Sequence, residues 1–144
     1  MPRPITPSLA ADAIIELSDR PGRPIVLIER AYPPLGWAIP GGFVDVGETV
    51  EHAAIREARE EVSLDVRLRA LLGLYSEPTR DPRGHTVTAV YVAEAEGVPQ
   101  ADDDAKNLQI FLPDELPHIL AFDHATVLED YLRFRNSGQL APLR

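Results

Sequence analysis

The stretch GFVDVGETVEHAAIREAREEVSL, residues 42–64, gathers Glu57, Glu60 and Glu61 within five positions of one predicted helix. We expect this helix from about Thr49 to Val62, with Thr49 as its N-cap and an apolar stripe formed by Ala54, Ile55, Ala58 and Val62. Like charges three or four positions apart on a helix repel each other and reduce its stability. The glutamates therefore need an explanation beyond helix formation.

At about 100° per residue, the three glutamates fall beside the apolar stripe, at the border of the core. Arg56 lies one turn before Glu60 and can pair with it, whereas Glu57 and Glu61 have no basic partner nearby in the sequence. One interpretation is a solvated acidic face, which is what charge runs on helices usually are. The alternative is a site for a divalent cation, which prefers carboxylate oxygens. The glycines at 41, 42 and 47 favour the cation site, because glycine lets the backbone approach a ligand closely.

The composition predicts one folded domain. The chain has 144 residues, of which 44% are hydrophobic and 26% charged, and its net charge of -9 argues against a nucleic-acid partner. It contains no cysteine, so disulfides and thiolate metal sites are excluded. No apolar run suits a membrane span or a signal peptide, which fits a cytoplasmic protein without membrane partners.

The remaining pattern predicts a mixed β-sheet between helices, an α/β (α+β) sandwich. Arg20-Pro-Gly-Arg reads as the turn of a hairpin between the first two strands. A second helix is expected from His124 to about Asn136, capped by Asp123 and ending near Gly138. Strands are expected at Ala10–Leu17, Pro24–Glu29, Trp37–Ile39, Val66–Ser76, Thr86–Ala95 and Gln109–Leu112.

Gly42, five residues, Glu48, seven residues and then REAREEVSL resembles the signature box of the Nudix hydrolases. The resemblance implies a Nudix-like fold, with residues 1–144 as a single Nudix domain and the box at 42–64. One position departs from the family pattern, since Ser63 stands where the family has glycine. We expect serine there to strain or reshape the end of the helix, because glycine is the usual C-cap.

The resemblance also implies Mg²⁺ or Mn²⁺ as cofactor and a small-molecule nucleotide as substrate. In this reading Glu57 and Glu61 are the main metal ligands, and the Gly41 carbonyl is a backbone ligand. Glu60 is a further ligand or the general base. Arg56 pairs with Glu48 and Glu60 and holds the ligands in place. Two rivals for the general base remain, namely Glu61 and the acidic loop Asp102–Asp104, which is otherwise a solvated turn. A homodimer is expected from the resemblance alone.

Pro78 and the run RDPRGHTV resemble the short microbial ADP-ribose pyrophosphatases of this family, which implies ADP-ribose as substrate and AMP and ribose 5-phosphate as products. Phosphate or substrate contacts are expected from Arg30, Arg80, Arg83 and Asp103, against the alternative that these are ordinary surface residues. The histidines have no His partner at metal spacing, and His124 is expected only to begin the last helix.

Two other functions stay open. One is a Nudix pyrophosphatase for nucleoside triphosphates or dinucleoside polyphosphates, which would share the box and differ in its loops. The other is a non-catalytic nucleotide-sensing Nudix module. The presence of all three glutamates and Arg56, and the lack of a basic helical extension after Asn136, count against the sensing module.

Overall fold

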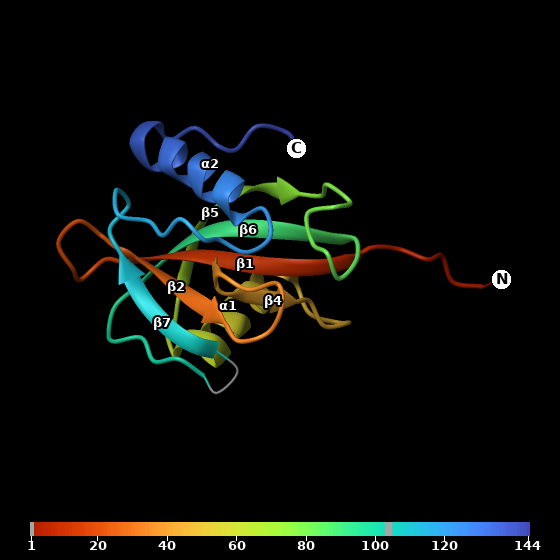
Figure 1. Cartoon of the computed structure of the whole chain (residues 1–144), viewed down its shortest axis with the longest axis horizontal. Helices are drawn as coiled ribbons and strands as arrows, with labels where there is room; N and C mark the ends of the chain where they lie inside the picture. The colour runs from red at the N-terminus through yellow and green to blue at the C-terminus, as the bar shows by residue number, and fades with distance from the viewer. Residues whose placement is uncertain (1, 103–104) are drawn as a thin grey trace.

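The computed structural model describes residues 2–102 and 105–144, and its centre is strand β1 (Ser8–Leu17). β1 runs parallel to β6 (Thr86–Ala95) on one side. On the other side it pairs antiparallel with β4 (Gly41–Phe43) near its start and with β2 (Ile25–Arg30) near its end. The sheet thus changes its neighbouring strand halfway along β1 (Figure 1).

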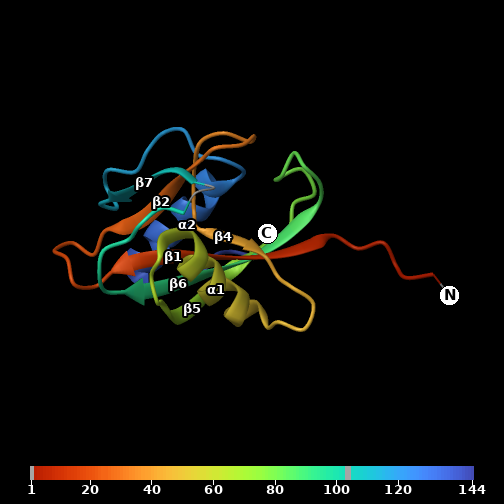
Figure 2. The ribbon, with the colours of Figure 1, turned by 90° about the horizontal axis from the view of Figure 1, so that it is seen from below.

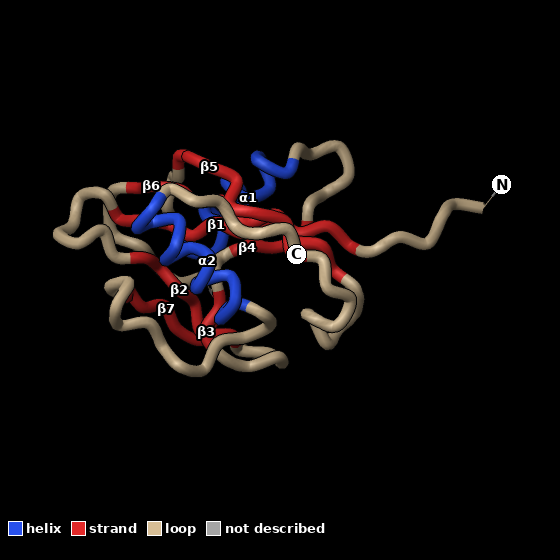
Figure 3. The backbone as a smooth tube through the Cα atoms, turned by 90° about the horizontal axis from the view of Figure 1, so that it is seen from above, coloured by secondary structure: helices blue, strands red, loops and turns tan. Residues whose placement is uncertain are grey.

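The outer strands complete a mixed sheet. β2 pairs antiparallel with β3 (Trp37–Ala38) and β7 (Ala105–Phe111), and β6 pairs antiparallel with β5 (Arg67–Tyr75). Helix α1 (Val50–Val62) covers one face of the sheet and helix α2 (His124–Ser137) covers the other (Figures 2 and 3). Among the described residues, no helix has the length and apolarity needed to span a bilayer.

Burial on both faces explains the nearly continuous apolar sequence of β1. Ala13, Ile15 and Leu17 pack in one cluster with Ala58 and Val62 of α1. Ile14 points the other way and packs with residues of α2, namely Val127, Leu128 and Tyr131. Successive side chains of a strand alternate between faces, so the two acidic residues of β1, Asp12 and Glu16, share the α2 side with Ile14. Both are buried there.

The expected fold class is confirmed, and most expected elements lie within two residues of the observed ones. One strand was missed, and the predicted start of another was wrong. β4 was not predicted, because glycine has low strand propensity and the partner of β4 is distant in the sequence. β7 begins at Ala105 rather than Gln109, because pairing with β2 extends the strand through polar residues.

Asp123 begins α2 as expected, but it does not cap the helix with its side chain. Its carboxylate accepts two hydrogen bonds from the guanidinium of Arg80, at 2.9 and 2.7 Å. The far end of α2 agrees with the prediction, since Gly138 adopts a left-handed conformation with φ 77°.

At the end of α1, Ser63 keeps the backbone shape that glycine would give. Its φ of 60° and ψ of 34° are left-handed, and its N–H donates to the carbonyl of Arg59 at 3.1 Å. We expected serine either to strain the end of the helix or to reshape it. The backbone strain is observed, and the shape of the helix end is unchanged. An L-residue in this conformation costs about 1 kcal/mol more than glycine.

We therefore predict that Ser63→Gly raises the free energy of unfolding by about 1 kcal/mol, because it removes the steric penalty of Cβ. Ser63→Ala is the matched control and should leave the stability close to wild type, since alanine keeps the Cβ. Urea unfolding of the three proteins measures the difference. Equal stability of Ser63→Gly and Ser63→Ala would contradict the strain.

Candidate active site

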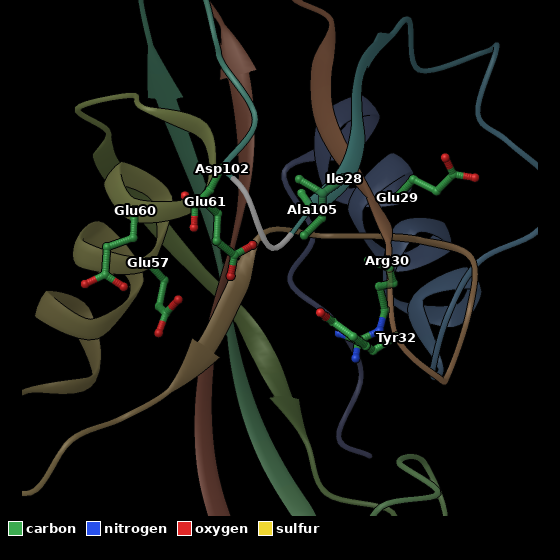
Figure 4. Close-up of a pocket in the computed structure, with 10 residues that line it drawn as sticks. Ile28, Glu29, Arg30, Tyr32, Glu57, Glu60, Glu61, Asp102 and Ala105 are labelled. Carbon is green, nitrogen blue, oxygen red and sulfur yellow. The ribbon is translucent and has the colours of Figure 1, made fainter.

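The cavity that holds the glutamate cluster lies where β1 changes its neighbour. β1 pairs with β4 at Ala10–Asp12 and with β2 at Glu16, so β2 and α1 face each other across the gap. The cavity there has a volume of about 350 Å³. One wall carries Glu57, Glu60 and Glu61 of α1 with Asp102, and the facing wall carries Ile28, Glu29, Arg30, Tyr32 and Ala105 (Figure 4).

A smaller cavity of about 70 Å³ adjoins the first and shares Ile28, Arg30 and Glu61 with it. Its other lining residues come from four distant parts of the chain and include Asp12, Gly41, Gly42, Arg80, Phe122 and His124. Glu61 thus lies where the two cavities meet, and Figure 4 shows its carboxylate reaching toward the middle of the larger one.

Arg56 holds three of the acidic side chains together. Its Nε and Nη2 donate to the two carboxylate oxygens of Glu48, at 2.7 and 2.9 Å. Its Nη1 donates to Glu57 at 3.0 Å and to Glu60 at 3.2 Å, and Nη2 also donates to the Phe43 carbonyl at 3.1 Å. The bidentate bond to Glu48 fixes the plane of the guanidinium, so Arg56 ties the loop before α1 to the middle of the helix.

These contacts shift the pKa values of both partners. The hydrogen bonds of Arg56 lower the pKa of Glu48 to about 2. The hydrogen bond to Glu48, and then that to Glu57, raises the pKa of Arg56 above its usual range. Both groups therefore stay charged at any pH where the protein would work.

The expectation that Glu57 lacks a basic partner was wrong. Arg56 is its neighbour in the sequence, yet the long side chain bends back to bond it. Glu61 differs, because its Oε2 is buried and has no hydrogen-bond partner among the residues that the structure describes. Burial, and then the charge of Glu57, raises the pKa of Glu61 to about 9.

The cluster fits a divalent cation. A buried carboxylate oxygen without a partner is costly, and a cation would satisfy it. The adjoining backbone also comes close, since a Cβ on Gly42 would overlap the Glu57 carboxylate and a Cβ on Gly41 would overlap Asp12. Within residues 2–102 and 105–144, no three His, Asp or Glu side chains converge as a ready metal cluster. A cation would therefore complete its coordination with backbone, water or substrate oxygens.

Arg30 and Arg83, both predicted to bind substrate, meet at one aromatic ring. The guanidinium carbons lie 4.9 Å and 5.2 Å from the centre of the Phe122 ring. Arg30 also donates to the Pro34 carbonyl at 2.8 Å, and Arg83 pairs with Asp81 at 2.9 Å. Burial, and then the nearby charge of Arg83, lowers the pKa of Arg30. Asp81 thus already balances the charge of Arg83, which lines neither cavity, whereas Arg30 lines both.

Arg80 is neither a solvated turn residue nor a partner of Asp81. Its side chain is buried and bonds Asp123 twice, and its Nη1 donates to Thr88 at 2.6 Å. These partners already occupy the Arg80 guanidinium. The contact of Arg80 with substrate stays a prediction. Asp103, the remaining predicted substrate residue, lies outside the described residues.

The sequence interpretation missed Asp12, Phe122 and the buried His124 as parts of the site. His124 begins α2 as expected, but its imidazole lies in the small cavity rather than on the surface. One signal was present for Asp12, since an acidic residue interrupts the apolar run AADAII of a strand buried on both faces. Such a residue is retained against the cost of burying a charge.

Comparison with known proteins agrees with this geometry. The sequence model of the NUDIX domain matches residues 7–131. An ADP-ribose pyrophosphatase from Methanocaldococcus jannaschii is 44% identical over 90% of this chain and 76% of its own length. The match therefore extends over both cavity walls and not only over the box.

Two other similar proteins have names that mention ADP-ribose. The ADPR responsive transcriptional repressor NtrR of Acinetobacter baylyi is 30% identical over 96% of this chain, which spans only 58% of the repressor. The NUDIX domain of Shewanella oneidensis NrtR, solved in complex with ADP ribose, has a TM-score of 0.78. It is 25% identical, and the alignment covers 92% of this chain and 90% of that domain.

We predict that Arg80→Ala lowers the free energy of unfolding by about 3 kcal/mol, because it leaves the half-buried Asp123 without its partner. Arg59→Ala is the matched control and should cost less than about 1 kcal/mol, since both side chains of its ion pair with Asp65 are exposed and such a pair contributes little. Thermal unfolding compares the two variants. A loss from Arg80→Ala no larger than that from Arg59→Ala would contradict a structural ion pair between Arg80 and Asp123.

The raised pKa of Glu61 links metal binding to pH. With a pKa of about 9 instead of 4.5, Glu61 is protonated at pH 7, so a cation must displace this proton. Mn²⁺ affinity should rise with pH and level off above about 9, with about one proton released per ion at pH 7. Without metal, the raised pKa stabilises the fold at low pH, and this contribution is lost as pH rises from 4.5 through about 9.

Titration calorimetry in two buffers of different ionisation enthalpy counts the released protons. Glu61→Gln is the control, because it should release none and should remove this loss of stability between pH 5 and 9. Equal heats for the wild type in the two buffers would show that Glu61 carries no proton for the cation to displace.

Proposed function

Since the chain belongs to the Nudix hydrolase family, we propose that it hydrolyses ADP-ribose to AMP and ribose 5-phosphate with Mg²⁺ or Mn²⁺ as cofactor. The observation that carries the proposal is Oε2 of Glu61, which has no hydrogen-bond partner among the described residues, on a side chain that faces Arg30 across a cavity of about 350 Å³ (Figure 4). The resemblance to the archaeal ADP-ribose pyrophosphatase supports the choice of substrate.

In this proposal Glu57, Glu61 and the Gly41 carbonyl hold the cation, with Glu60 as a further ligand or as the base. When bound, the cation screens the charge of the pyrophosphate and activates the attacking water. Glu60 is half-exposed and bonded to Arg56, whereas Glu61 lies deeper, so the two differ in their access to that water. Asp102 lines the same cavity and is the third rival for the base.

The other residues of the chain bind and orient the substrate. Arg30 and Arg83, held against Phe122, offer guanidinium groups to the phosphate oxygens. Ile28, Ala31 and Tyr32 give the wall opposite the glutamates an apolar surface suited to a nucleoside. Arg56 keeps Glu57 and Glu60 in position while Glu48 holds the guanidinium. Water then adds to phosphorus, the bridging P–O bond breaks, and the base takes the proton of the water.

An ADP-ribose sensor without catalysis is the second candidate, favoured by the similarity to the repressor and to the ADP-ribose complex. Binding alone would not require the charge repulsion around Glu61. The complete set of Arg56, Glu57, Glu60 and Glu61, joined as described above, supports hydrolysis over sensing.

We also propose a homodimer. Several large apolar side chains are exposed on β5 and on the segment that follows α2, namely Leu71, Leu74, Leu140 and Leu143. Exposed apolar area of this kind is what a protein interface covers.

The test of the proposal is product release with Mg²⁺ across ADP-ribose, other nucleotide sugars, NADH, dinucleoside polyphosphates and nucleoside triphosphates. We expect ADP-ribose to have the highest kcat/KM and to yield AMP and ribose 5-phosphate. A higher kcat/KM for a nucleoside triphosphate would contradict the substrate. Tight binding of ADP-ribose without turnover would support the sensor instead.

Glu61→Gln should lower kcat at least about 1000-fold, because it removes a charged ligand from the cation. The fold should survive, since the glutamine amide has nearly the shape of the protonated carboxyl that burial favours at this position. Glu115→Gln, in an exposed loop, is the matched control and should keep full activity. Activity of Glu61→Gln close to that of the control would overturn the metal assignment.

A further inference from the structure

We infer that Asp12 and His124, which lie outside the box, form a positioning pair that holds Gly41 and Gly42 against the metal-binding glutamates. The inference rests on the proposed metal site, because Gly41 is one of its expected ligands. It assigns to β1 and to the start of α2 a part in metal binding.

Asp12 sets the place of Gly41. It lies on β1 directly opposite Gly41 of β4, and its side chain is buried. The contact is so close that a Cβ on Gly41 would overlap the Asp12 carboxylate. On the other side, a Cβ on Gly42 would overlap the carboxylate of Glu57. The two glycines are thus held between one carboxylate from β1 and one from α1.

His124 sets the place of Asp12. Its Nδ1 accepts a hydrogen bond from the backbone N–H of Ile39 at 3.1 Å, so the proton of the neutral ring is on Nε2. Nε2 lies 3.4 Å from Oδ2 of Asp12. The imidazole therefore bridges Asp12 and a backbone amide two residues before Gly41. One buried ring therefore contacts both β1 and the segment that leads into β4.

The start of α2 is itself anchored, so His124 has a fixed base. Asp123 receives two hydrogen bonds from Arg80, and Arg80 bonds Thr88 on β6. The His124 N–H donates to the Ala121 carbonyl at 3.1 Å, and the ring of Phe122 packs 5.2 Å from the imidazole. These contacts connect the imidazole to the sheet as well as to the helix.

A buried histidine that satisfies a backbone amide is often only structural, but Asp12 gives this one a further role. The Asp12 side chain lines the smaller cavity together with Gly41, Gly42 and Glu61, so its carboxylate lies beside the expected metal ligands. A residue kept only for stability at this place would be apolar, like its neighbours Ala11, Ala13 and Ile14. A bound cation would offset the cost of burying the negative charge of Asp12, which explains an acidic residue at this position.

The test compares His124→Leu, which lacks both ring nitrogens, with His124→Gln, whose amide can accept from Ile39 and donate to Asp12. His124→Leu should raise the Kd for Mn²⁺ at least tenfold by electron paramagnetic resonance. It should also speed amide exchange at Ile39 and Gly41, and lower kcat more than it changes the KM for ADP-ribose. His124→Gln should restore all three within about threefold, since amide groups can replace both contacts. His118→Leu, on an exposed loop, is the control and should behave as wild type.

If His124→Leu does not fold, Asp12→Asn and Asp12→Ala replace it. Asparagine keeps an oxygen that faces Nε2 of His124 and keeps the contact with Gly41, so the exchange of the Gly41 amide should stay native. Alanine loses the oxygen and the contact, so the Gly41 amide should exchange faster. Wild-type Mn²⁺ affinity and exchange in Asp12→Ala, or in folded His124→Leu, would overturn the positioning pair. Failure of the wild type to bind Mn²⁺ would instead overturn the metal site and this inference with it.

Discussion

The charge repulsion between Glu57 and Glu61, one helical turn apart at the border of the core, is the constraint on which the rest of the site depends. Arg56 reaches Glu48, Glu57 and Glu60 but not the unpartnered oxygen of Glu61. The molecule keeps this arrangement although it makes Glu61 hard to ionise. We propose that a divalent cation offsets this cost, so that the cluster that weakens the helix alone becomes favourable when metal and substrate are bound.

The scaffold places this cluster by using β1 for two purposes. Its apolar residues pack both helices onto the sheet, while its two acidic residues connect to α2. Glu16 accepts hydrogen bonds from Tyr131 at 2.7 Å and Arg135 at 3.2 Å, far from the cavity, and serves the fold. Asp12, on the same side of the strand, lies at the cavity beside Gly41 and faces His124. Between these two positions the neighbour of β1 changes from β4 to β2, and the cavity lies at this change.

The sequence was sufficient where contacts are local. The helix, its Thr49 cap and the pairing of Arg56 with Glu48 and Glu60 all lie within one short stretch, and all are confirmed. It failed where partners are distant, because spacing carries no information about them. Arg80 binds Asp123 from another part of the chain, β4 pairs with β1, and His124 joins Ile39 to Asp12. Even within the box, the bond from Arg56 to Glu57 was missed, since helical geometry does not place adjacent residues face to face.

The most direct measurement is a crystal structure with Mn²⁺ and an ADP-ribose analogue whose bridging oxygen is replaced by methylene, with the ion located by its anomalous scattering. We expect an anomalous peak within about 2.3 Å of carboxylate oxygens of Glu57 and Glu61 and of the Gly41 carbonyl, with phosphate oxygens completing the coordination. The diphosphate should lie between this ion and Arg30. An ion that binds the diphosphate without touching Glu57 or Glu61 would show that this pair of carboxylates is not the metal site.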